Sequence, residues 1–110
     1  MVPRGDFLGF GRIVRRREVL ELVEERTRDG RETSYRTLVA ELWLSRDAAT
    51  SHLKRLWAQR FIKSTSYPSR FSEQLGPGES IRDLSFTLAR RGRERLQWYR
   101  ERDGREDEAE

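Results

Sequence analysis

Hydrophobic residues between positions 13 and 28 recur at helical spacing, which predicts a first helix that ends near Gly30. The stripe expected to face the core consists of Ile13, Leu20, Val23 and Thr27. Val19 and Leu22 lie beside that stripe and form a second apolar edge. A partner subunit is the simplest cover for this edge, and packing against the C-terminal helix of the same chain remains open.

The next apolar pattern predicts two short helices joined by a tight turn. The first lies within "TSYRTLVAEL", where Ser34 is the expected N-cap. Its inward-facing residues are Leu38, Val39 and Leu42. The turn "WLS" follows, and Ser45 can cap the second helix by accepting a hydrogen bond from a backbone N–H. Two helices separated by so few residues have the helix-turn-helix arrangement.

Two strands are predicted after these helices. Residues 61–67, "FIKSTSY", have the composition of a strand. Residues 82–89, "RDLSFTLA", alternate Leu84, Phe86 and Leu88 with polar neighbours, which is the period of a half-buried strand. Together the two segments predict an antiparallel pair, joined by a segment longer than the usual hairpin connection.

A final helix is predicted over "RRGRERLQWYRER", with Leu96 and Tyr99 toward the core. Beyond it, residues 103–110 lack any apolar side chain larger than alanine, which predicts an acidic disordered tail. We expect residues 1–11 to be a flexible N-terminal arm and residues 12–102 to form one domain. The expected fold class is α+β and mostly helical.

Charge is unevenly distributed along the chain. The 110 residues carry a formal net charge of +4. Residues 103–110 hold five acids against Arg105, a net of about −4, so residues 1–102 carry about +8. Such a basic body suits a polyanion, nucleic acid first and an acidic membrane surface second. The positive charge is nearly all arginine, which forks onto phosphate and guanine but also accompanies a GC-rich genome.

The sequence argues against several kinds of chemistry. It has no cysteine, which excludes disulfides, thiolate zinc sites and thiol catalysis. His52 is the only histidine, and Ser51 beside it cannot act with it as a nucleophile and base, because neighbours on a helix do not face each other. We therefore expect no enzyme, no metal site and no cofactor. No apolar run approaches the roughly 20 residues of a membrane span, so we expect a cytoplasmic protein with no membrane partner.

The helix expected over residues 46–60 has a polar side that is unusual for a solvated face. Its inward side consists of Ala49, Leu53, Leu56 and Arg60, with His52 and Trp57 at the margins. Its opposite side presents Asp47, Thr50, Ser51, Lys54 and Arg55, with Arg46 and Ala48 at the edges. Solvated faces usually carry long helix formers, whereas small polar groups followed by two cations suit a helix in the major groove of DNA. A solvated face on a helix that merely packs remains open.

The stretch "SYRTLVAELWLSRDAATSHLKRLWAQRFI" resembles the helix-turn-helix of winged-helix transcription regulators of the MarR, ArsR and PadR kind. The matching positions are Leu38, Leu42, Leu44, Ser45, His52, Leu53, Lys54, Leu56 and Ile62. The segment "LARRGRERL" resembles the family's "L-T-x-x-G-R-x-x-L" motif through Gly92, Arg93 and Leu96. The resemblance covers roughly residues 12–100. It implies a winged helix-turn-helix with a two-stranded antiparallel wing and a C-terminal helix.

Three features depart from the family pattern. Trp43 stands in the turn where the family often has glycine, so the backbone there can differ. Ala89 replaces the capping threonine, and the wing loop is unusually long. The family resemblance implies a homodimer that reads a pseudo-palindromic duplex with two recognition helices about one DNA turn apart. Because the ends of this chain are short, a large dimer interface is not expected.

We therefore expect a sequence-specific transcription regulator that binds double-stranded DNA, with the helix at 46–60 in the major groove and a basic wing. The expected contacts on that helix are Lys54 and Arg55 first, then Arg46, Thr50 and Ser51. The preceding helix opens with Ser34, Tyr35 and Arg36, and its N-terminus is expected to meet the phosphate backbone. Arg70 and Arg82 flank the wing loop and can reach the minor groove or phosphates.

Two other functions remain open. One is a winged-helix protein-interaction module of a larger nucleic-acid-processing assembly, favoured if Trp43, Trp57, Trp98 and Phe71 are exposed together. The other is sequence-tolerant binding of single strands, with aromatic stacking beside arginine. For His52 we expect a partly buried, hydrogen-bonded role rather than pH sensing. Effector control rests on the family resemblance alone, and a ligand would then have to sit at a dimer interface.

Overall fold

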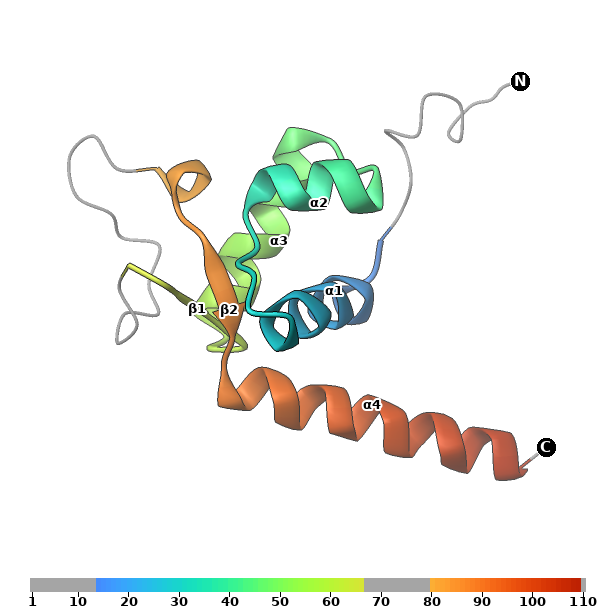
Figure 1. The fold of residues 1–110 in the computed structure, drawn as a ribbon. Helices are drawn as coiled ribbons and strands as arrows, with labels where there is room; N and C mark the ends of the chain where they lie inside the picture. Colours follow the sequence, from blue (N-terminus) through green and yellow to red (C-terminus); the bar gives the residue numbers. More distant parts are fainter. Residues whose placement is uncertain (1–13, 67–79, 110) are drawn as a thin grey trace, which may run out of the picture.

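The computed structural model describes residues 14–66 and 80–109, with side chains as far as residue 103. In chain order its elements are α1 (Arg16–Arg28), α2 (Tyr35–Leu42), α3 (Arg46–Ala58), β1 (Ile62–Ser64), the 3₁₀ helix η1 (Ile81–Asp83), β2 (Phe86–Leu88) and α4 (Arg90–Ala109). The described chain is α+β and mostly helical, which confirms the predicted class. In Figure 1, α4 lies along one side of the molecule and α2 lies on the opposite side, with α1 and the sheet between them.

Strand β2 is held on both of its edges. It pairs antiparallel with β1, where Leu88 lies opposite Ile62. On its other edge Phe86 forms an isolated antiparallel bridge with Thr33, whose N–H donates to the Phe86 carbonyl at 2.9 Å. The Leu88 N–H also donates to the hydroxyl of Thr27, at 3.0 Å, near the end of α1. The short sheet is thereby tied to α1 and to the segment that enters α2.

The core is centred on two aromatic rings. Trp57 of α3 and Phe86 of β2 are fully buried and meet edge to face, with ring centroids 5.5 Å apart. Fully buried leucines from all four α-helices surround them, namely Leu20, Leu38, Leu53, Leu56 and Leu96. Because every α-helix contributes, the described elements share one hydrophobic core.

The ends of α2 and α3 are capped as the sequence predicts. Ser34 is the N-cap of α2 and forms a capping box with Thr37, whose hydroxyl accepts from the Ser34 N–H at 3.2 Å. Ser45 is the N-cap of α3 and accepts from the Ala48 N–H at 3.1 Å. Between the helices, Trp43 has left-handed backbone angles, φ 60° and ψ 34°. Trp43 thus adopts the conformation that glycine favours, at a cost of roughly 1–2 kcal/mol for an L-residue.

Helix α4 approaches the rest of the molecule at a glycine. A Cβ atom at Gly92 would collide with the carbonyl oxygen of Phe61 and lie 2.6 Å from Cδ1 of Leu88. Only a residue without a side chain lets the helix backbone come this close. One turn later the buried Leu96 fixes the same face of α4 in the core, and the partly buried Tyr99 packs against it.

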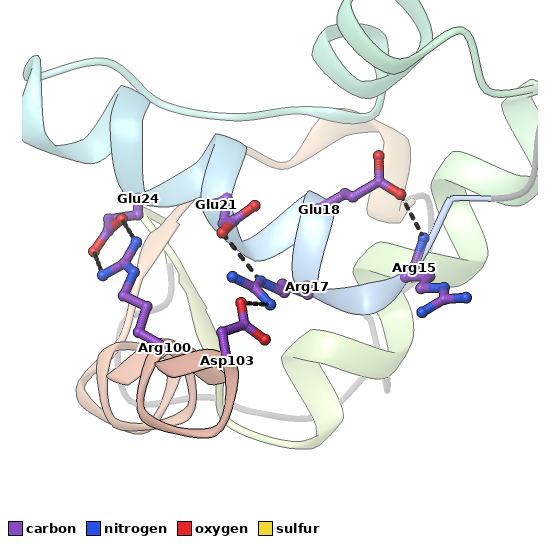
Figure 2. A network of polar contacts seen from close by, with 7 residues as sticks. All are labelled: Arg15, Arg17, Glu18, Glu21, Glu24, Arg100 and Asp103. Carbon is purple, nitrogen blue, oxygen red and sulfur yellow. Dashed lines mark hydrogen bonds and ion pairs between the residues drawn. The ribbon is translucent and has the colours of Figure 1, made fainter. Parts of the chain in front are cut away.

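Ion pairs join α4 to α1, as Figure 2 shows. Arg17 of α1 pairs with Asp103 of α4 and with Glu21 of its own helix, the latter at 3.2 Å. Arg100 of α4 holds Glu24 of α1 through two contacts of 2.6 and 3.2 Å. The hydrogen bond from Arg100 lowers the pKa of the Glu24 carboxyl, against the opposing effect of partial burial. This seam fixes the direction in which α4 leaves the core.

The second apolar edge of α1 is covered within the chain. Val19 is fully buried where α1 packs on β2, α3 and α4, and Leu22 packs partly buried against the same core. Of the two covers that the sequence left open, packing within the chain accounts for Val19, while Leu22 is only partly buried. The helix begins at Arg16, and Ile13 lies outside the described residues.

Both predicted strands were too long. Of residues 61–67 the strand occupies 62–64, and Tyr67 lies outside the described residues. In the second segment, the hydroxyl of Ser80 accepts from the Arg82 N–H at 3.2 Å and starts η1, so the strand begins only at Phe86. A local side-chain hydrogen bond of this kind competes with strand pairing. The alternating residues Leu84, Phe86 and Leu88 are nevertheless buried as predicted.

The C-terminal helix is longer than the sequence predicts. α4 continues to Ala109, so residues 103–109, expected to be disordered, extend the helix. Of residues 103–109, Arg105, Glu106, Glu108 and Ala109 have high intrinsic helix propensity. The ion pair of Asp103 with Arg17 also ties the helix down beyond residue 102. The predicted flexible arm at residues 1–11 lies outside the described residues.

Candidate nucleic-acid interface

Helix α3 divides cleanly into a buried side and a polar side. Its buried residues are Ala49, Leu53, Leu56 and Trp57. On the opposite side Ser51, Lys54 and Arg55 are exposed, and with Ala58 they line a shallow hollow of about 280 Å³. Three of the predicted contact residues therefore lie together on an exposed surface of α3.

The first turn of α3 meets η1 through a second group of predicted residues. The guanidinium of Arg82 donates to the hydroxyl of Thr50 at 3.1 Å and to the carboxylate of Asp47 at 3.0 Å. The same guanidinium lies 5.4 Å from the ring centroid of Tyr35, the first residue of α2. Arg82, predicted only as a residue that flanks the wing loop, thus connects η1 to the N-terminal ends of both α2 and α3.

Positive charge is concentrated at this corner. Arg36 lies over the ring of Tyr35, at 5.9 Å from the centroid, and its Nε donates to the tyrosine hydroxyl at 3.5 Å. The pKa of Tyr35 is lowered by this hydrogen bond first, and then by the charges of Arg36, Arg46 and Arg82. Partial burial acts in the opposite direction. Arg36, Arg46 and Arg82 thus place positive charge near the point where the N-termini of α2 and α3 converge.

The remaining predicted residues have different positions. Ser34 is half-buried, and its hydroxyl lies 3.4 Å from that of Thr37 within the capping box, so its role in the fold is to begin α2. Arg46 is exposed at the start of α3, and its carbonyl accepts from Thr50 at 2.8 Å. Arg70 lies outside the described residues. The described predicted residues thus lie in two groups, Ser51, Lys54 and Arg55 on the polar side of α3 and Tyr35, Arg36, Arg46, Thr50 and Arg82 at the corner, with Ser34 in the capping box.

His52 lies away from that surface, on the edge of a separate cleft. It is half-buried, and burial lowers its pKa, with a further contribution from the charge of Arg55. A hydrogen bond with the Val14 backbone acts in the opposite direction. These features support the predicted hydrogen-bonded role. The cleft has a volume of about 550 Å³ and is lined by Val14, Arg15, Arg16, Arg17, His52, Arg55, Leu56, Tyr99 and Asp103.

The aromatic residues considered for protein contact do not form one patch. Trp57 is fully buried in the core. Trp43 is 63% exposed at the turn after α2, and Trp98 is 42% exposed on α4, which lies on the opposite side of the molecule (Figure 1). Phe71 lies outside the described residues. The described aromatic rings are therefore not exposed together, although joint exposure was the feature expected to favour a protein-interaction module.

Sequence patterns missed the pairing of Asp47 with Arg82. The two residues are 35 positions apart and belong to different elements, so no periodic signal links them. A signal did exist on α4, where Arg91, Arg95, Trp98 and Arg102 recur at helical spacing. This spacing places the four residues along one side of α4, away from the packing residues Leu96 and Tyr99.

Comparisons of the chain with protein-family models, curated proteins and solved structures gave no match. Within residues 14–66 and 80–109, no helix is both long enough and apolar enough to cross a membrane. In the same residues, no three histidine, aspartate or glutamate side chains gather in a way that could hold a metal ion. Function must therefore be inferred from the surface itself.

Proposed function

We propose that this chain is a winged helix-turn-helix domain that binds duplex DNA and regulates transcription. The element order supports this: α2 and α3 are joined by a three-residue turn, and an antiparallel strand pair follows α3. In this proposal β1 and β2 are the strands of the wing. The chain acts by binding, and the surface over α2, α3 and η1 is its DNA contact.

The observation that carries the proposal is the polar side of α3. Lys54 and Arg55 are exposed one turn after small polar side chains, on a helix whose other side is fully buried. A helix about 10–12 Å across fits the major groove of B-DNA. Thr50 and Ser51 are then near base edges or phosphates, while the longer cations reach phosphate or guanine.

The corner at η1 supplies phosphate contacts in this arrangement. The N-terminus of α2 presents backbone N–H groups and the side chains of Tyr35 and Arg36. Arg82 pairs with Asp47, whose carboxylate is 97% exposed. Because exposed ion pairs contribute little to stability, a DNA phosphate can replace Asp47 as the partner of Arg82. The corner therefore positions the duplex, and α3 reads it.

We further propose that the DNA-bound form is a homodimer. Helix-turn-helix proteins commonly bind half-sites about one DNA turn apart, so that two recognition helices enter successive major grooves. One copy offers one α3, which covers one half-site. High-affinity binding of a monomer to a single half-site would contradict the homodimer but not the proposed DNA-binding surface.

The test replaces both central cations, in the variant Lys54→Ala/Arg55→Ala. Its affinity for duplex DNA should fall by about 2–4 kcal/mol, and the salt dependence should become shallower if both side chains meet phosphates. The matched control is Arg28→Ala/Arg93→Ala, which removes two exposed cations elsewhere. Equal affinity loss in the two variants, or none in the first, would remove the groove assignment.

A second candidate function is protein contact within a larger nucleic-acid-processing assembly. The exposure of Trp43 in a strained conformation favours it, because such residues concentrate at functional sites. A Trp43→Gly variant separates the two functions. Unchanged duplex affinity combined with loss of a co-purifying partner would support protein contact, whereas retention of all partners would remove this candidate.

A further inference from the structure

A second arginine-rich surface lies on the outer side of α4. Arg91, Arg95, Trp98 and Arg102 recur at intervals of four, three and four residues, so they share one side of the helix. The buried Gly92 and Leu96, which pack on the core, lie about a third of a turn away on the adjoining side of the helix. We call these four residues the α4 stripe. Helix α4, which carries them, lies on the opposite side of the molecule from α2 (Figure 1).

Aromatic rings and guanidinium groups alternate along the stripe. Arg95 lies between two rings, 5.5 Å from the centroid of Phe61 and 5.0 Å from that of Trp98. Arg102 lies 4.7 Å from the Trp98 centroid, and Arg91 lies 5.9 Å from that of Phe61. A notch of about 260 Å³ opens among Phe61, Arg91, Glu94, Arg95 and Trp98.

The positive charge at this notch is not neutralised by the nearby acid. Neither Arg91 nor Arg95 forms an ion pair with a carboxylate in the described residues. The carboxylate of Glu94 is engaged with Arg90 at 3.3 Å. Arg16 approaches the Phe61 ring from α1, at 5.6 Å, and adds to the positive field. Ring contacts stabilise a guanidinium modestly but leave its charge in place, so an anion is favoured here.

We propose that the α4 stripe binds an unpaired strand of nucleic acid. Phosphates lie on Arg91 and Arg95, and a base stacks on Trp98, which is 42% exposed. A stacked base takes the place of one guanidinium on the ring, and that guanidinium turns to the neighbouring phosphate. The stripe spans about 16 Å along the helix at 1.5 Å per residue, room for a short run of nucleotides.

An unpaired strand fits this surface better than a duplex or an acidic protein. Phosphates of a duplex require cations alone and leave an exposed indole without a use, because paired bases are already stacked. An acidic peptide offers carboxylates to arginine but has no flat group that matches the indole face. The combination of arginine and exposed tryptophan is the one that single-strand-binding surfaces use.

The test measures fluorescence anisotropy of a labelled oligothymidylate of about ten nucleotides, with the full chain at low salt. Arg91→Ala/Arg95→Ala should weaken binding about tenfold or more, and Trp98→Ala about tenfold. Trp98→Phe keeps an aromatic face and should recover most of the affinity. The matched charge control, Arg28→Ala/Arg93→Ala, should change affinity by less than about threefold.

A second readout follows the indole itself. In a Trp43→Phe background the exposed tryptophan is Trp98, because Trp57 is buried. Oligonucleotide binding should quench its fluorescence, and inorganic phosphate alone should not. Equal affinity loss in the control and stripe variants would overturn the proposal, since it would indicate general electrostatics. Absence of quenching, or capture of an acidic peptide with equal affinity, would overturn it as well.

The α4 stripe and the proposed duplex-binding surface are different sites, so separate variants can test each of them. The variant Lys54→Ala/Arg55→Ala should lose duplex binding and retain oligothymidylate binding within about threefold. The stripe variants should show the opposite pattern. Duplex binding without single-strand binding would remove the α4 stripe alone, and single-strand binding without duplex binding would remove the α3 surface alone.

Discussion

Arginine populates two regions of this molecule and has different neighbours in each. At the seam between α1 and α4, Arg17 and Arg100 meet carboxylates of the opposite helix (Figure 2). At the corner of α2, α3 and η1, Arg36 and Arg82 lie over the ring of Tyr35, and Arg82 has the exposed Asp47 as its carboxylate partner. Arg36 and Arg46 form no ion pair with a described carboxylate. The seam is internally neutralised, while the corner keeps an excess of positive charge.

The difference teaches how to separate structural from binding arginines in a highly charged chain. An arginine whose carboxylate partner is partly buried, as Glu24 is for Arg100, can contribute to the fold, whereas the partner of Arg82, Asp47, is almost fully exposed. An arginine that lies among aromatic rings and other cations adds to a net positive charge at the surface, and an external anion can neutralise that charge. Substitutions at the seam should therefore change stability, and substitutions at the corner should change DNA affinity.

The largest expected effect is a loss of stability when α4 is displaced, because its position also determines the contacts at the seam with α1. Gly92→Ala places a Cβ atom against the Phe61 carbonyl and the Leu88 side chain, so α4 must shift away from the sheet. We expect a loss of about 3 kcal/mol in the free energy of unfolding, measured by urea denaturation. A loss below about 0.5 kcal/mol would mean that α4 is not seated as described.

The next effect belongs to the corner. Removing two of its cations in Arg46→Ala/Arg82→Ala should weaken duplex binding about tenfold while lowering the free energy of unfolding by no more than about 1 kcal/mol, because the partner of Arg82, Asp47, is exposed. Thermal unfolding and anisotropy on the same samples provide the check. If the double variant instead unfolds more easily and binds DNA normally, the corner is a structural feature and the contrast with the seam disappears.

A smaller effect is expected for the pair at the seam. Arg100→Ala should lower the free energy of unfolding by about 0.2–1 kcal/mol, because the pair is only partly buried. A double-mutant cycle with Glu24→Gln isolates the coupling between the two side chains. Duplex affinity should stay within about twofold of the unaltered chain, and a larger change would mean that the seam also takes part in binding.

The smallest effect is a pH dependence at the same pair. The pKa of Glu24 is lower in the folded chain than its ordinary value near 4.5, chiefly through the hydrogen bond from Arg100. The ionised carboxylate therefore stabilises the fold above that ordinary value, and this contribution is lost as the pH falls through the folded-state pKa. The stability difference between the unaltered chain and Glu24→Gln should be constant near neutral pH and shrink below pH 4.5. A difference independent of pH would contradict the assignment.

The sequence predicted much of the fold because its signals were local. Ser34 and Ser45 cap their helices, and the stripe of Leu53 and Leu56 is buried as the period of 3.6 residues requires. The tertiary features were less accessible. Val19 is covered by other elements of the same chain, and η1 forms because the Ser80 hydroxyl turns the backbone. Neither contact has a periodic signature.

The candidate site shows the same limit. The exposed positions of Lys54 and Arg55 follow from helical periodicity alone, and the structure places them as predicted. The pairing of Arg82 with Asp47 depends on the position of η1 beside α3. This position is a tertiary contact that the periodicity of the sequence does not predict. The seam between α1 and α4 likewise depends on the close approach at Gly92. Long-range juxtapositions of charge therefore required the structure.

The most direct test of DNA binding is anisotropy of the unaltered chain on a random-sequence duplex across a salt series. The charged surface over α2, α3 and η1 predicts a steep loss of affinity with rising salt, with a slope of several units in log affinity against log salt. That result would justify a search for the specific site. Absence of duplex binding even at low salt would contradict the account and direct attention to the exposed tryptophans.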